Sequence, residues 1–594
     1  MILQALKSYY DRKAADADSG IAPPGWEWKE IAFVILLNAD GEVVNLENTR
    51  QMVGKKEVAQ SFLAPQSVKK TSGVAANLLW DNTEYVLGLP KERKGDNKSR
   101  EEREQRTLEQ HTAFVEKIKN LPPPADGDEG MRALLKFLAK TDKVALLEKF
   151  GAWQEMVSGS GNISFRLVAD SGLLFERPAV REAVNALKQT AADGEKGLCL
   201  VTGSEEIIER LHPSIKGVWG AQTSGANIVS FNQTAFCSYG KEQGSNAPVG
   251  SLSAFVYTTA LNHLLGKNSR QRLQVGDASA VFWSERSSEL EDHLTDYFGE
   301  PVKDDPDRQT RAVAALYTSI ENGSLLVKDD GTRFFVLGLS PNASRLAVRF
   351  WCVATVREMS VRIVQYFADI KIVHADHEPK TLSLFRLLVS TAVQGKSENI
   401  IPNLAGETMR AILNGTPYPA TLLMAAVRRI RADHDISYPR VALIKACLNR
   451  PCENFQKNST KEMQVSLDIE NKKIGYRLGR LFAALEKIQE EAQPGINATI
   501  RDRFYGAASG APASVFSTLI KLSKNHLSKL GKEKPGREVW FEQLLMEIIS
   551  EISDFPATLD LADQGRFAIG YYHQRSKLFE KKETKEKSTE NKKL

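Results

Sequence analysis

The sequence predicts an α+β protein, in which a mixed α/β N-terminal lobe with short antiparallel strands precedes an all-α C-terminal helical bundle. Short apolar runs between turn residues occupy much of the first half, as in antiparallel sheets. Later segments repeat apolar residues at helical spacing with short connections, which is typical of a bundle. Because 594 residues exceed what one core supports, we expect a lobe over 1–345, a helical connecting region over 346–460, the bundle over 461–580 and a disordered tail over 581–594.

The composition limits the class of protein. A net charge of +5 permits a nucleic-acid partner without requiring one, since local clustering of lysine and arginine decides phosphate binding. Five cysteines are too few for a disulfide framework in a chain of this size, so we expect a reducing, cytoplasmic location. The N-terminus lacks an apolar signal region, and no apolar run reaches the roughly 18 residues that indicate a membrane span.

The N-terminal lobe is expected to begin with an amphipathic helix over 2–13. The apolar runs on either side of residues 38–41, Asn-Ala-Asp-Gly, predict a β-hairpin. Residues 91–110 are either a flexible insertion or the polar start of a helix that continues beyond them. Amphipathic spacing predicts a helix over 131–150, and alternation predicts a pair of strands over 161–175.

The middle of the chain predicts alternating strands and helices. Residues 198–203 predict a buried strand and 204–212 a short helix, but no P-loop or dinucleotide glycine motif is present, so we expect no cofactor. The later expected elements are a helix over 251–265, a strand over 277–283, a helix ending near 298, a helix over 308–321, two strands within 333–353, helices over 354–455, and four or five bundle helices within 463–579.

The central run, residues 212–248, places glycine and small polar residues between short apolar pieces, which predicts brief strands joined by tight turns. Such turns present backbone amides and neutral side chains that can meet phosphate, sugar or base edges. Composition alone favours a loop-rich scaffold whose polar side chains cap their own turns. The candidate DNA contacts of the run are Gln222, Ser224, Asn227, Asn232 and Lys241.

A second stretch places two lysines directly before a turn. We call Lys69, Lys70, Thr71 and Ser72 the lysine turn, and Asn77 follows it. Two cations beside hydroxyls and backbone amides suit phosphate or groove contact. A solvated turn with incidental lysines is the alternative.

Arginines gather in the helices predicted for the second half of the chain. A polyanion-facing surface and an ordinary solvated helix face both explain such charge. The candidates are Arg428, Arg429 and Arg431 in the connecting region, with Arg477, Arg480, Arg501 and Arg503 on the expected polar faces of the bundle.

Residues 374–378, His-Ala-Asp-His-Glu, resemble the metal cluster of a nuclease. In that case His374, Asp376 and His377 would hold the ion. Their spacing fits neither one helix face nor a known zinc pattern. A polar loop explains the same residues, so we expect no metal and no catalytic residue.

Several stretches are similar to the large-subunit family of type I-C CRISPR surveillance (Cascade) complexes. The similarity runs nearly from end to end, apart from the charged stretch near 91–110 and the tail. The stretches are MILQAL, KTSGVAANLLWDNTEYVLG, IKGVWGAQTSGANIVSFNQTAFCSYGKEQGSNAPV, VLGLSPNASRLAVRFW, YRLGRLFAALEKIQ, ATIRDRFYGAAS and FAIGYYHQR.

The resemblance implies a non-catalytic subunit in antiviral defence. It implies recognition of the protospacer-adjacent motif in double-stranded DNA, strand opening, R-loop formation, stabilisation of the non-target strand and recruitment of a helicase-nuclease. The implied partners are crRNA, target DNA, the backbone subunits of the crRNA-binding filament, the crRNA-processing subunit, small subunits and that helicase-nuclease, with no membrane.

Under this resemblance, the lysine turn, Asn77 and the central run would contact the motif, and the seven arginines would follow the non-target strand. The C-terminal bundle resembles a small subunit that such families also make separately from an internal start, for which Met463 is our candidate. Two alternatives stay open. They are a metal-dependent nuclease that uses His374, Asp376 and His377, and a pure assembly scaffold without DNA contact.

Overall fold

The computed structural model describes residues 1–54, 56–70, 73–91, 99–159, 161–190, 194–300, 305, 307–321, 331–401, 403–450 and 462–580. The chain forms two compact units. Unit 1 comprises Met1–Lys216 and Ser224–His263, and unit 2 comprises Gly217–Thr223 and the chain from Leu264 onward. The predicted α+β class is confirmed. The boundaries expected at 345 and 460 stay predictions, and the tail over 581–594 lies outside the described residues.

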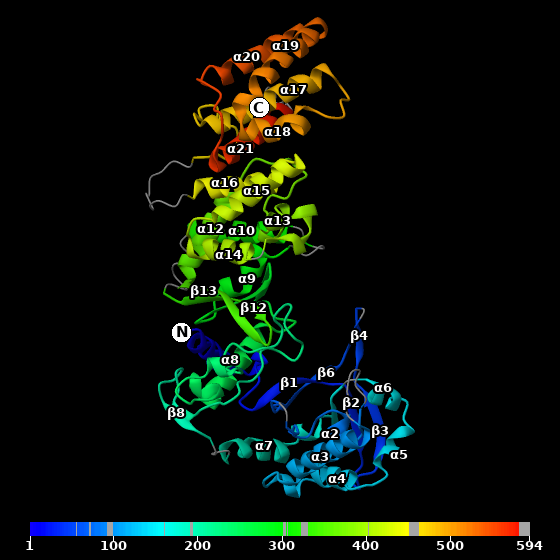
Figure 1. The fold of residues 1–594 in the computed structure, drawn as a ribbon. Helices are drawn as coiled ribbons and strands as arrows, with labels where there is room; N and C mark the ends of the chain where they lie inside the picture. The colour runs from blue at the N-terminus through cyan, green and yellow to red at the C-terminus, as the bar shows by residue number, and fades with distance from the viewer. Residues whose placement is uncertain are drawn as a thin grey trace, which may run out of the picture. The chain divides into compact units, whose positions relative to one another are not determined.

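Two small sheets form the strand layer of unit 1 (Figure 1). One pairs β1 (Trp26–Ile31) with β6 (Gln60–Pro65), and the other has the order β3-β2-β7. The predicted hairpin is confirmed, because β2 (Phe33–Leu37) and β3 (Val43–Asn48) pair antiparallel across residues 38–41. β7 (Ile163–Leu167) instead pairs parallel with β2, so the strand pair predicted over 161–175 is wrong. A further short hairpin joins β4 (Gln51–Val53) to β5 (Lys56–Val58).

Helices accompany these strands in unit 1. The charged stretch begins the helix α3 from residue 100, where Ser99 and Glu102 form a capping box; residues 92–98 lie outside the described residues. The helix predicted over 131–150 is divided into α4 and α5, because the turn over 139–142 interrupts it. The helices of this part are α1 (Ile2–Ala14), α2 (Thr83–Leu87), α3 (Arg100–Lys119), α4 (Glu129–Leu138), α5 (Lys143–Glu148), α6 (Trp153–Ser158) and α7 (Pro178–Thr190).

The central run contains turns rather than the predicted strands. A hairpin of β8 (Lys196–Leu198) and β9 (Glu205–Ile207) precedes it, so the helix predicted over 204–212 is wrong. Within the run, all of which is described, one isolated bridge joins Ile215 to Ala226. Gly225 beside this bridge has φ +92°, and a Cβ atom there would lie 2.8 Å from the Ile215 carbonyl oxygen. Left-handed glycines of this kind break strands into turns.

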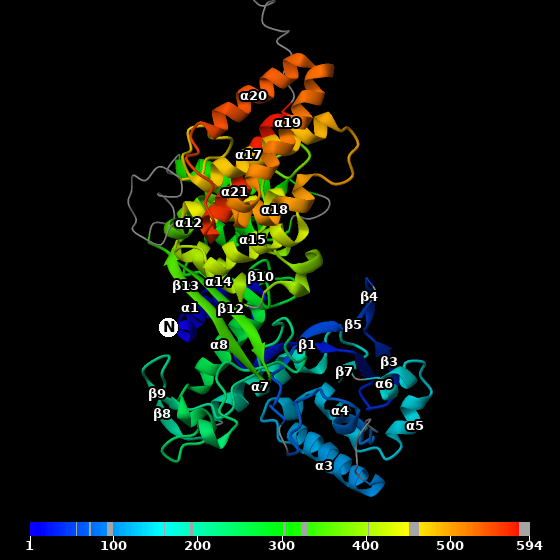
Figure 2. The ribbon, with the colours of Figure 1, turned by 45° about the horizontal axis from the view of Figure 1, so that its top comes forward.

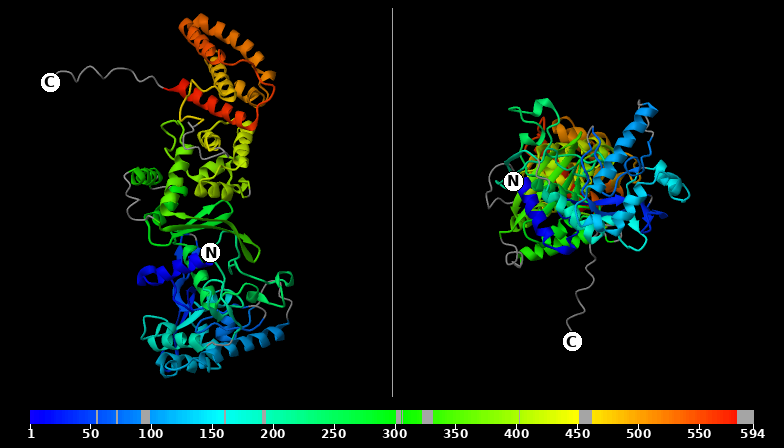
Figure 3. Two further views of the ribbon diagram at one scale, coloured as in Figure 1. Left: turned by 90° about the vertical axis from the view of Figure 1, so that its left-hand side faces the viewer. Right: turned by 90° about the horizontal axis from the view of Figure 1, so that it is seen from below.

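After the central run, helix α8 belongs to unit 1 except for its last residue, and the elements from β10 onward belong to unit 2. Unit 2 contains a four-stranded antiparallel sheet of order β10-β11-β12-β13. The strands predicted over 277–283 and within 333–353 are confirmed as part of it. Helices α12 and α14 pack against β13 (Figures 1 and 3). The elements are α8 (Ser251–Leu264), β10 (Arg272–Val275), β11 (Ala278–Ser284), α9 (Glu289–Phe298), α10 (Arg308–Glu321), β12 (Arg333–Asn342), β13 (Arg345–Thr355), α12 (Val356–Ile370), α13 (Leu384–Ser390), α14 (Leu404–Asn414), α15 (Ala420–Asp433) and α16 (Tyr438–Asn449).

Five helices form the predicted bundle, in which α17 packs along α21 (Figure 2). They are α17 (Ile474–Ala492), α18 (Ile500–Gly510), α19 (Phe516–Glu533), α20 (Pro535–Ile549) and α21 (Leu561–Phe579). One apolar core extends from Leu273 on β10 to Tyr571 on α21, so the sheet, the connecting helices and the bundle share buried surface.

Two glycines let the backbones of α17 and α21 approach closely. A Cβ atom at Gly479 would lie 2.1 Å from the Phe567 carbonyl oxygen. A Cβ atom at Gly570 would lie 2.1 Å from the Tyr476 carbonyl oxygen. Since backbone atoms cannot give way like a side chain, packing requires glycine at both positions.

We predict that Gly479→Ala destabilises the protein by about 1–3 kcal/mol, because the added methyl group overpacks the crossing of α17 and α21. Chemical denaturation measures the change. Gly506→Ala is the control, since a Cβ atom at this position in α18 meets nothing within 4 Å and alanine favours helix by about 0.5–1 kcal/mol. A Gly479→Ala protein as stable as the Gly506→Ala protein would contradict this packing.

Candidate nucleic-acid interface

The lysine turn and the central run meet in unit 1. Lys69 Nζ donates hydrogen bonds to the His212 carbonyl oxygen and to Asn227 Oδ1, both at 3.1 Å. Asn227 Nδ2 in turn donates to the His212 carbonyl oxygen at 3.0 Å and to that of Pro213 at 2.9 Å. Two stretches more than 140 residues apart, both chosen from sequence, therefore share one hydrogen-bonded junction.

The histidine at this junction is a neutral support. Its Nδ1 lies 2.7 Å from the hydroxyl oxygen of Tyr257 on α8. Burial lowers the pKa of His212 to about 4, and the charge of Lys69 adds to the effect. Desolvation also lowers the pKa of Lys69, which Glu209 partly opposes. The ring therefore contributes no charge near pH 7, and Lys69 Nζ supplies hydrogen-bond donors to the junction.

Lys70 is positioned by a buried carboxylate. Its Nζ lies 2.6 and 2.7 Å from the two oxygens of Asp81, which is only 2 % exposed. The same ammonium lies 3.6 Å from the centroid of the Tyr85 ring. Asp81 also accepts hydrogen bonds from the backbone amides of Asn77 and Asn82, each at 2.9 Å. With 32 % of its side chain exposed, Lys70 is fixed in place yet accessible.

Three further lysines join this region; Lys216 belongs to the central run, and the sequence analysis missed Lys29 and Lys117. Lys29 Nζ on β1 lies 4.4 Å from the Trp80 ring centroid, and Lys117 Nζ on α3 donates to the Ala76 carbonyl oxygen at 2.7 Å. Burial lowers the pKa of both lysines, and neighbouring lysines lower it further against the pull of Asp81. Lys216 is among the neighbours that act on Lys29. The lysine cluster is Lys29, Lys69, Lys70, Lys117 and Lys216.

Only tertiary structure brings these lysines together, since they come from different strands, helices and turns. The carboxylates that act on them are Asp81, Glu27 and Glu209. Five ammonium groups gathered in one region suit the binding of a polyanion. The cluster supplies hydrogen-bond donors and positive charge, which are the groups that contact phosphates.

The other predicted motif contacts lie in different environments. Asn77 is buried, and its Oδ1 accepts a hydrogen bond from the Val68 amide at 3.0 Å, so it braces the lysine turn. Thr71 and Ser72 lie outside the described residues. The predicted contacts with exposed side chains are Ser224, Asn232 and Lys241 in unit 1 and Gln222 in unit 2.

The arginines predicted to follow the non-target strand divide into two groups. Arg428, Arg431 and Arg503 are exposed, although Arg431 also donates to Gln564 Oε1 at 3.3 Å. Arg429 forms an ion pair with Asp433 at 2.6 Å on its own helix. The first three remain candidates for DNA contact.

Arg477 and Arg480 are buried inside the bundle, which corrects the expectation that they lie on its polar faces. Arg480 has no exposed surface, and it donates to Gln574 Oε1 at 3.0 Å and to Glu547 Oε1 at 2.8 Å. Helical periodicity does not show this, because the partners come from α20 and α21. Both arginines are therefore left out of the candidate interface.

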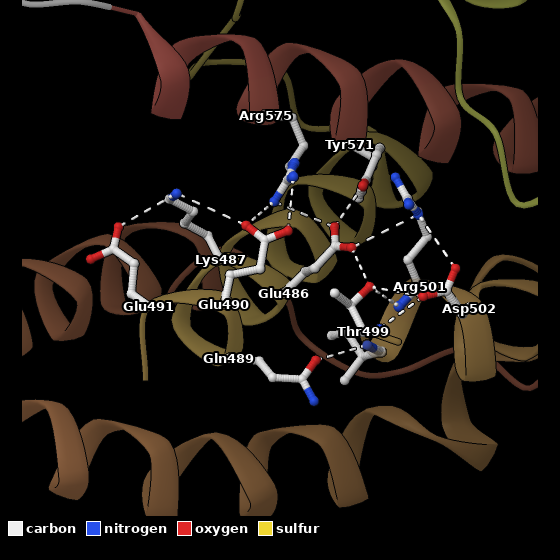
Figure 4. Close-up of polar contacts among 11 residues, drawn as sticks. Glu486, Lys487, Gln489, Glu490, Glu491, Thr499, Arg501, Asp502, Tyr571 and Arg575 are labelled. Carbon is white, nitrogen blue, oxygen red and sulfur yellow. Dashed lines mark hydrogen bonds and ion pairs between the residues drawn. The ribbon is translucent and has the colours of Figure 1, made fainter. Parts of the chain in front are cut away.

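Arg501 belongs to an internal polar network that joins α17, α18 and α21 (Figure 4). The buried carboxylate of Glu486 accepts hydrogen bonds from the hydroxyl groups of Thr499 and Tyr571, both at 2.6 Å. Arg501 lies 3.9 Å from the same carboxylate. Its charge is therefore used within the bundle, and we omit it from the interface as well.

Helix α19 supplies exposed cations in their place. Between Phe516 and Lys532 the helix contains no acidic residue, and Glu533 at its end is its one carboxylate. We call the exposed lysines of this helix the α19 lysines, and they are Lys521, Lys524, Lys529 and Lys532. Lysines spaced three residues apart in this set are neighbours on the helix surface.

The metal motif over 374–378 is an exposed loop in the structure. His374 Nδ1 lies 3.0 Å from the Ala375 carbonyl oxygen, and its ring centroid lies 5.0 Å from that of Tyr438. Within the described part of the chain, no three histidine, cysteine or acidic side chains gather as metal ligands would. Among the helices described, none combines the length and the apolar character needed to cross a bilayer.

The chain is therefore an α+β protein in which a cluster of lysines lies beside the polar turns of the central run. The chain matches, over residues 6–579, the family model described as CRISPR-associated protein (Cas_Csd1). It therefore belongs to the Csd1 family, the large subunit of type I-C Cascade, which confirms the resemblance noted in the sequence. None of the curated proteins compared with the chain matches it.

We predict that Arg480→Ala lowers the free energy of unfolding by about 2–4 kcal/mol, because it removes a buried guanidinium group with its hydrogen bond to Gln574 and its ion pair with the partly exposed Glu547, and leaves a void. It should leave the salt dependence of DNA binding unchanged. Denaturant unfolding and a salt titration measure the two effects. Lys524→Ala is the matched control, for which a change in stability within about 0.5 kcal/mol is expected at an exposed site. Weaker DNA binding by a fully stable Arg480→Ala protein would return Arg480 to the interface.

Proposed function

We propose that this Cascade subunit recognises the protospacer-adjacent motif in double-stranded DNA and promotes strand opening and R-loop formation. It also stabilises the non-target strand, recruits the helicase-nuclease and performs no catalysis itself. The observation that carries the proposal is the junction at Lys69, which joins the lysine turn to the central run. crRNA, backbone subunits, the crRNA-processing subunit and small subunits would assemble around it.

The two sides of the junction suit two kinds of DNA contact. Ammonium groups of the lysine cluster would bind phosphates, which set affinity and position but do not read sequence. Exposed amide and hydroxyl groups of the central run, such as those of Ser224 and Asn232, would meet base edges. A short motif needs few such contacts, since crRNA pairing reads the rest of the target.

A separate cationic surface in unit 2 would hold the displaced strand. Its proposed members are Arg428, Arg431, Arg503 and the α19 lysines, all of which are exposed. Single strands bind to positively charged surfaces without sequence preference, which suits a strand of any sequence. The buried arginines of the bundle, Arg477 and Arg480, do not belong to this surface.

The alternatives make different predictions. A nuclease that uses His374, Asp376 and His377 would cleave DNA with magnesium or manganese and lose this activity in His377→Ala. A pure scaffold would support assembly of the complex but make no difference to DNA affinity.

The family resemblance also suggests that the C-terminal bundle is made a second time, as a separate small subunit whose translation starts at Met463. Met463→Leu should then abolish this shorter protein in expressing cells.

We predict that Lys70→Ala weakens binding of the assembled complex to duplex DNA and lowers the slope of log affinity against log salt by about 1, because one phosphate contact is lost. Lys70→Arg keeps the charge and should keep the slope. Lys7→Ala is the matched control, since Lys7 pairs with Asp11 at 2.6 Å on α1. Unchanged affinity of the Lys70→Ala complex at several salt concentrations would contradict the proposed contact between Lys70 and a DNA phosphate.

For the displaced strand, we predict that Lys524→Ala lowers the salt slope of single-stranded DNA binding by about 0.7, the value expected for one contact. Filter binding over a range of salt concentrations measures it. Lys577→Ala on α21 serves as control, since this lysine is also exposed and pairs with Glu580. Equal salt slopes for the Lys524→Ala and Lys577→Ala proteins would argue against α19 as the binding surface for the displaced strand.

A further inference from the structure

The central run contains a tight turn whose first inner residue is a tyrosine. The Lys241 amide donates to the Ser238 carbonyl oxygen at 3.0 Å, which closes a four-residue turn. Its two inner residues, Tyr239 and Gly240, have φ values of +54° and +70°. Positive φ at both inner positions is the pattern of a type I′ turn, in which glycine, asparagine or aspartate is usual at the first.

Folding of the turn does not explain the tyrosine. A bulky L-residue with positive φ is strained, and such residues persist where the surroundings hold them for a function. The Tyr239 side chain is 99 % exposed, so no packing within the chain compensates for the strain. The ring is held outward and has both faces free of the rest of the described chain.

The turn is braced from within the run. The Ser238 amide donates to Asn246 Oδ1 at 2.9 Å, and Asn246 Nδ2 donates to the carbonyl oxygens of Lys241 at 3.2 Å and Gln243 at 3.1 Å. One asparagine therefore fixes both ends of the turn. A braced turn fixes the backbone that carries the ring, so little backbone freedom is lost on binding.

The surroundings of the ring favour a nucleobase over an apolar protein surface. Over residues 224–251, Tyr239 is the one large apolar side chain that is exposed, and the next exposed ones along the sequence are Trp219 and Leu252. Its neighbours in the turn are polar, and Lys241 and Asn232 of the same run are exposed. An isolated aromatic ring beside a cation and amides is how single-strand binding proteins hold unpaired bases.

We propose that Tyr239 stacks on an unpaired nucleobase of the bound nucleic acid. The inference rests on the proposed function, since the lysine cluster joined to the same run would bind the phosphates of that nucleic acid. A base inside a duplex has no free face, so the ring selects a base that is already unpaired. Tyr239 thereby favours DNA whose strands have begun to separate.

The test uses the assembled complex and two duplex DNAs that carry the matched motif. One duplex is fully paired. The other has a three-base bubble beside the motif, and this bubble contains 2-aminopurine. The wild-type complex should bind the bubble DNA about tenfold more tightly than the paired duplex, because the stacking of one base on an aromatic ring stabilises binding by about that factor. It should also quench 2-aminopurine fluorescence. Tyr239→Phe and Tyr239→Trp keep a ring and should keep both effects.

Tyr239→Asn is the decisive variant, because asparagine adopts positive φ readily and leaves the turn intact. It should lose the preference for the bubble and the quenching, while paired-duplex affinity stays at the wild-type value. Equal bubble preference and quenching in Tyr239→Asn and wild type would overturn the stacking role. Failure of the Tyr239→Asn protein to join the complex would also overturn it, in favour of a protein contact.

The same experiment separates this inference from the proposed function. Scrambling the motif in the paired duplex tests motif recognition alone, and it does not involve an unpaired base. If the wild-type complex ignores the motif but still binds the bubble through Tyr239, the stacking role stands and motif recognition fails. If the motif matters and Tyr239→Asn changes nothing, the reverse holds.

Discussion

The buried carboxylate of Asp81 is the group on which the candidate interface depends. Its backbone pairs with Ile163 at the start of β7, through N to O distances of 3.2 and 2.7 Å. Its side chain holds Lys70 and the backbone amides of Asn77 and Asn82. Lysines brought together in a partly desolvated place repel one another, so they need a fixed counter-charge. Asp81 provides that charge and attaches the lysine turn to the central sheet of unit 1.

Burial decides what each cation does in this protein. Arg480 is enclosed and bonded on two sides, so its charge stabilises the bundle and cannot reach a ligand. Lys524 lies on an open helix face, where a flexible ammonium group can exchange water for phosphate at little cost. The lysine cluster is intermediate, because its members are positioned by protein groups yet retain net positive charge. The exposed cations proposed for strand contact therefore differ from the buried ones that stabilise the bundle.

The sequence predicts those parts that depend on local pattern. Residues 38–41 specify the turn between β2 and β3, and the apolar stripe of α17 specifies a bundle helix. It does not predict parts that depend on distant partners. β7 pairs parallel with β2 across more than a hundred residues, and the central run makes turns because its glycines adopt positive φ. Lys29 and Lys117 reach the interface from separate elements, and Gln574 and Glu547 draw Arg480 inward.

The central claim is that this subunit reads the motif through unit 1. The most direct measurement is selection from a duplex library that is randomised beside the crRNA target, using complexes assembled with and without the subunit. The account predicts that a small set of flanking sequences is enriched by the full complex and that this enrichment is lost when the subunit is omitted. The same enriched sequences in both samples would contradict it.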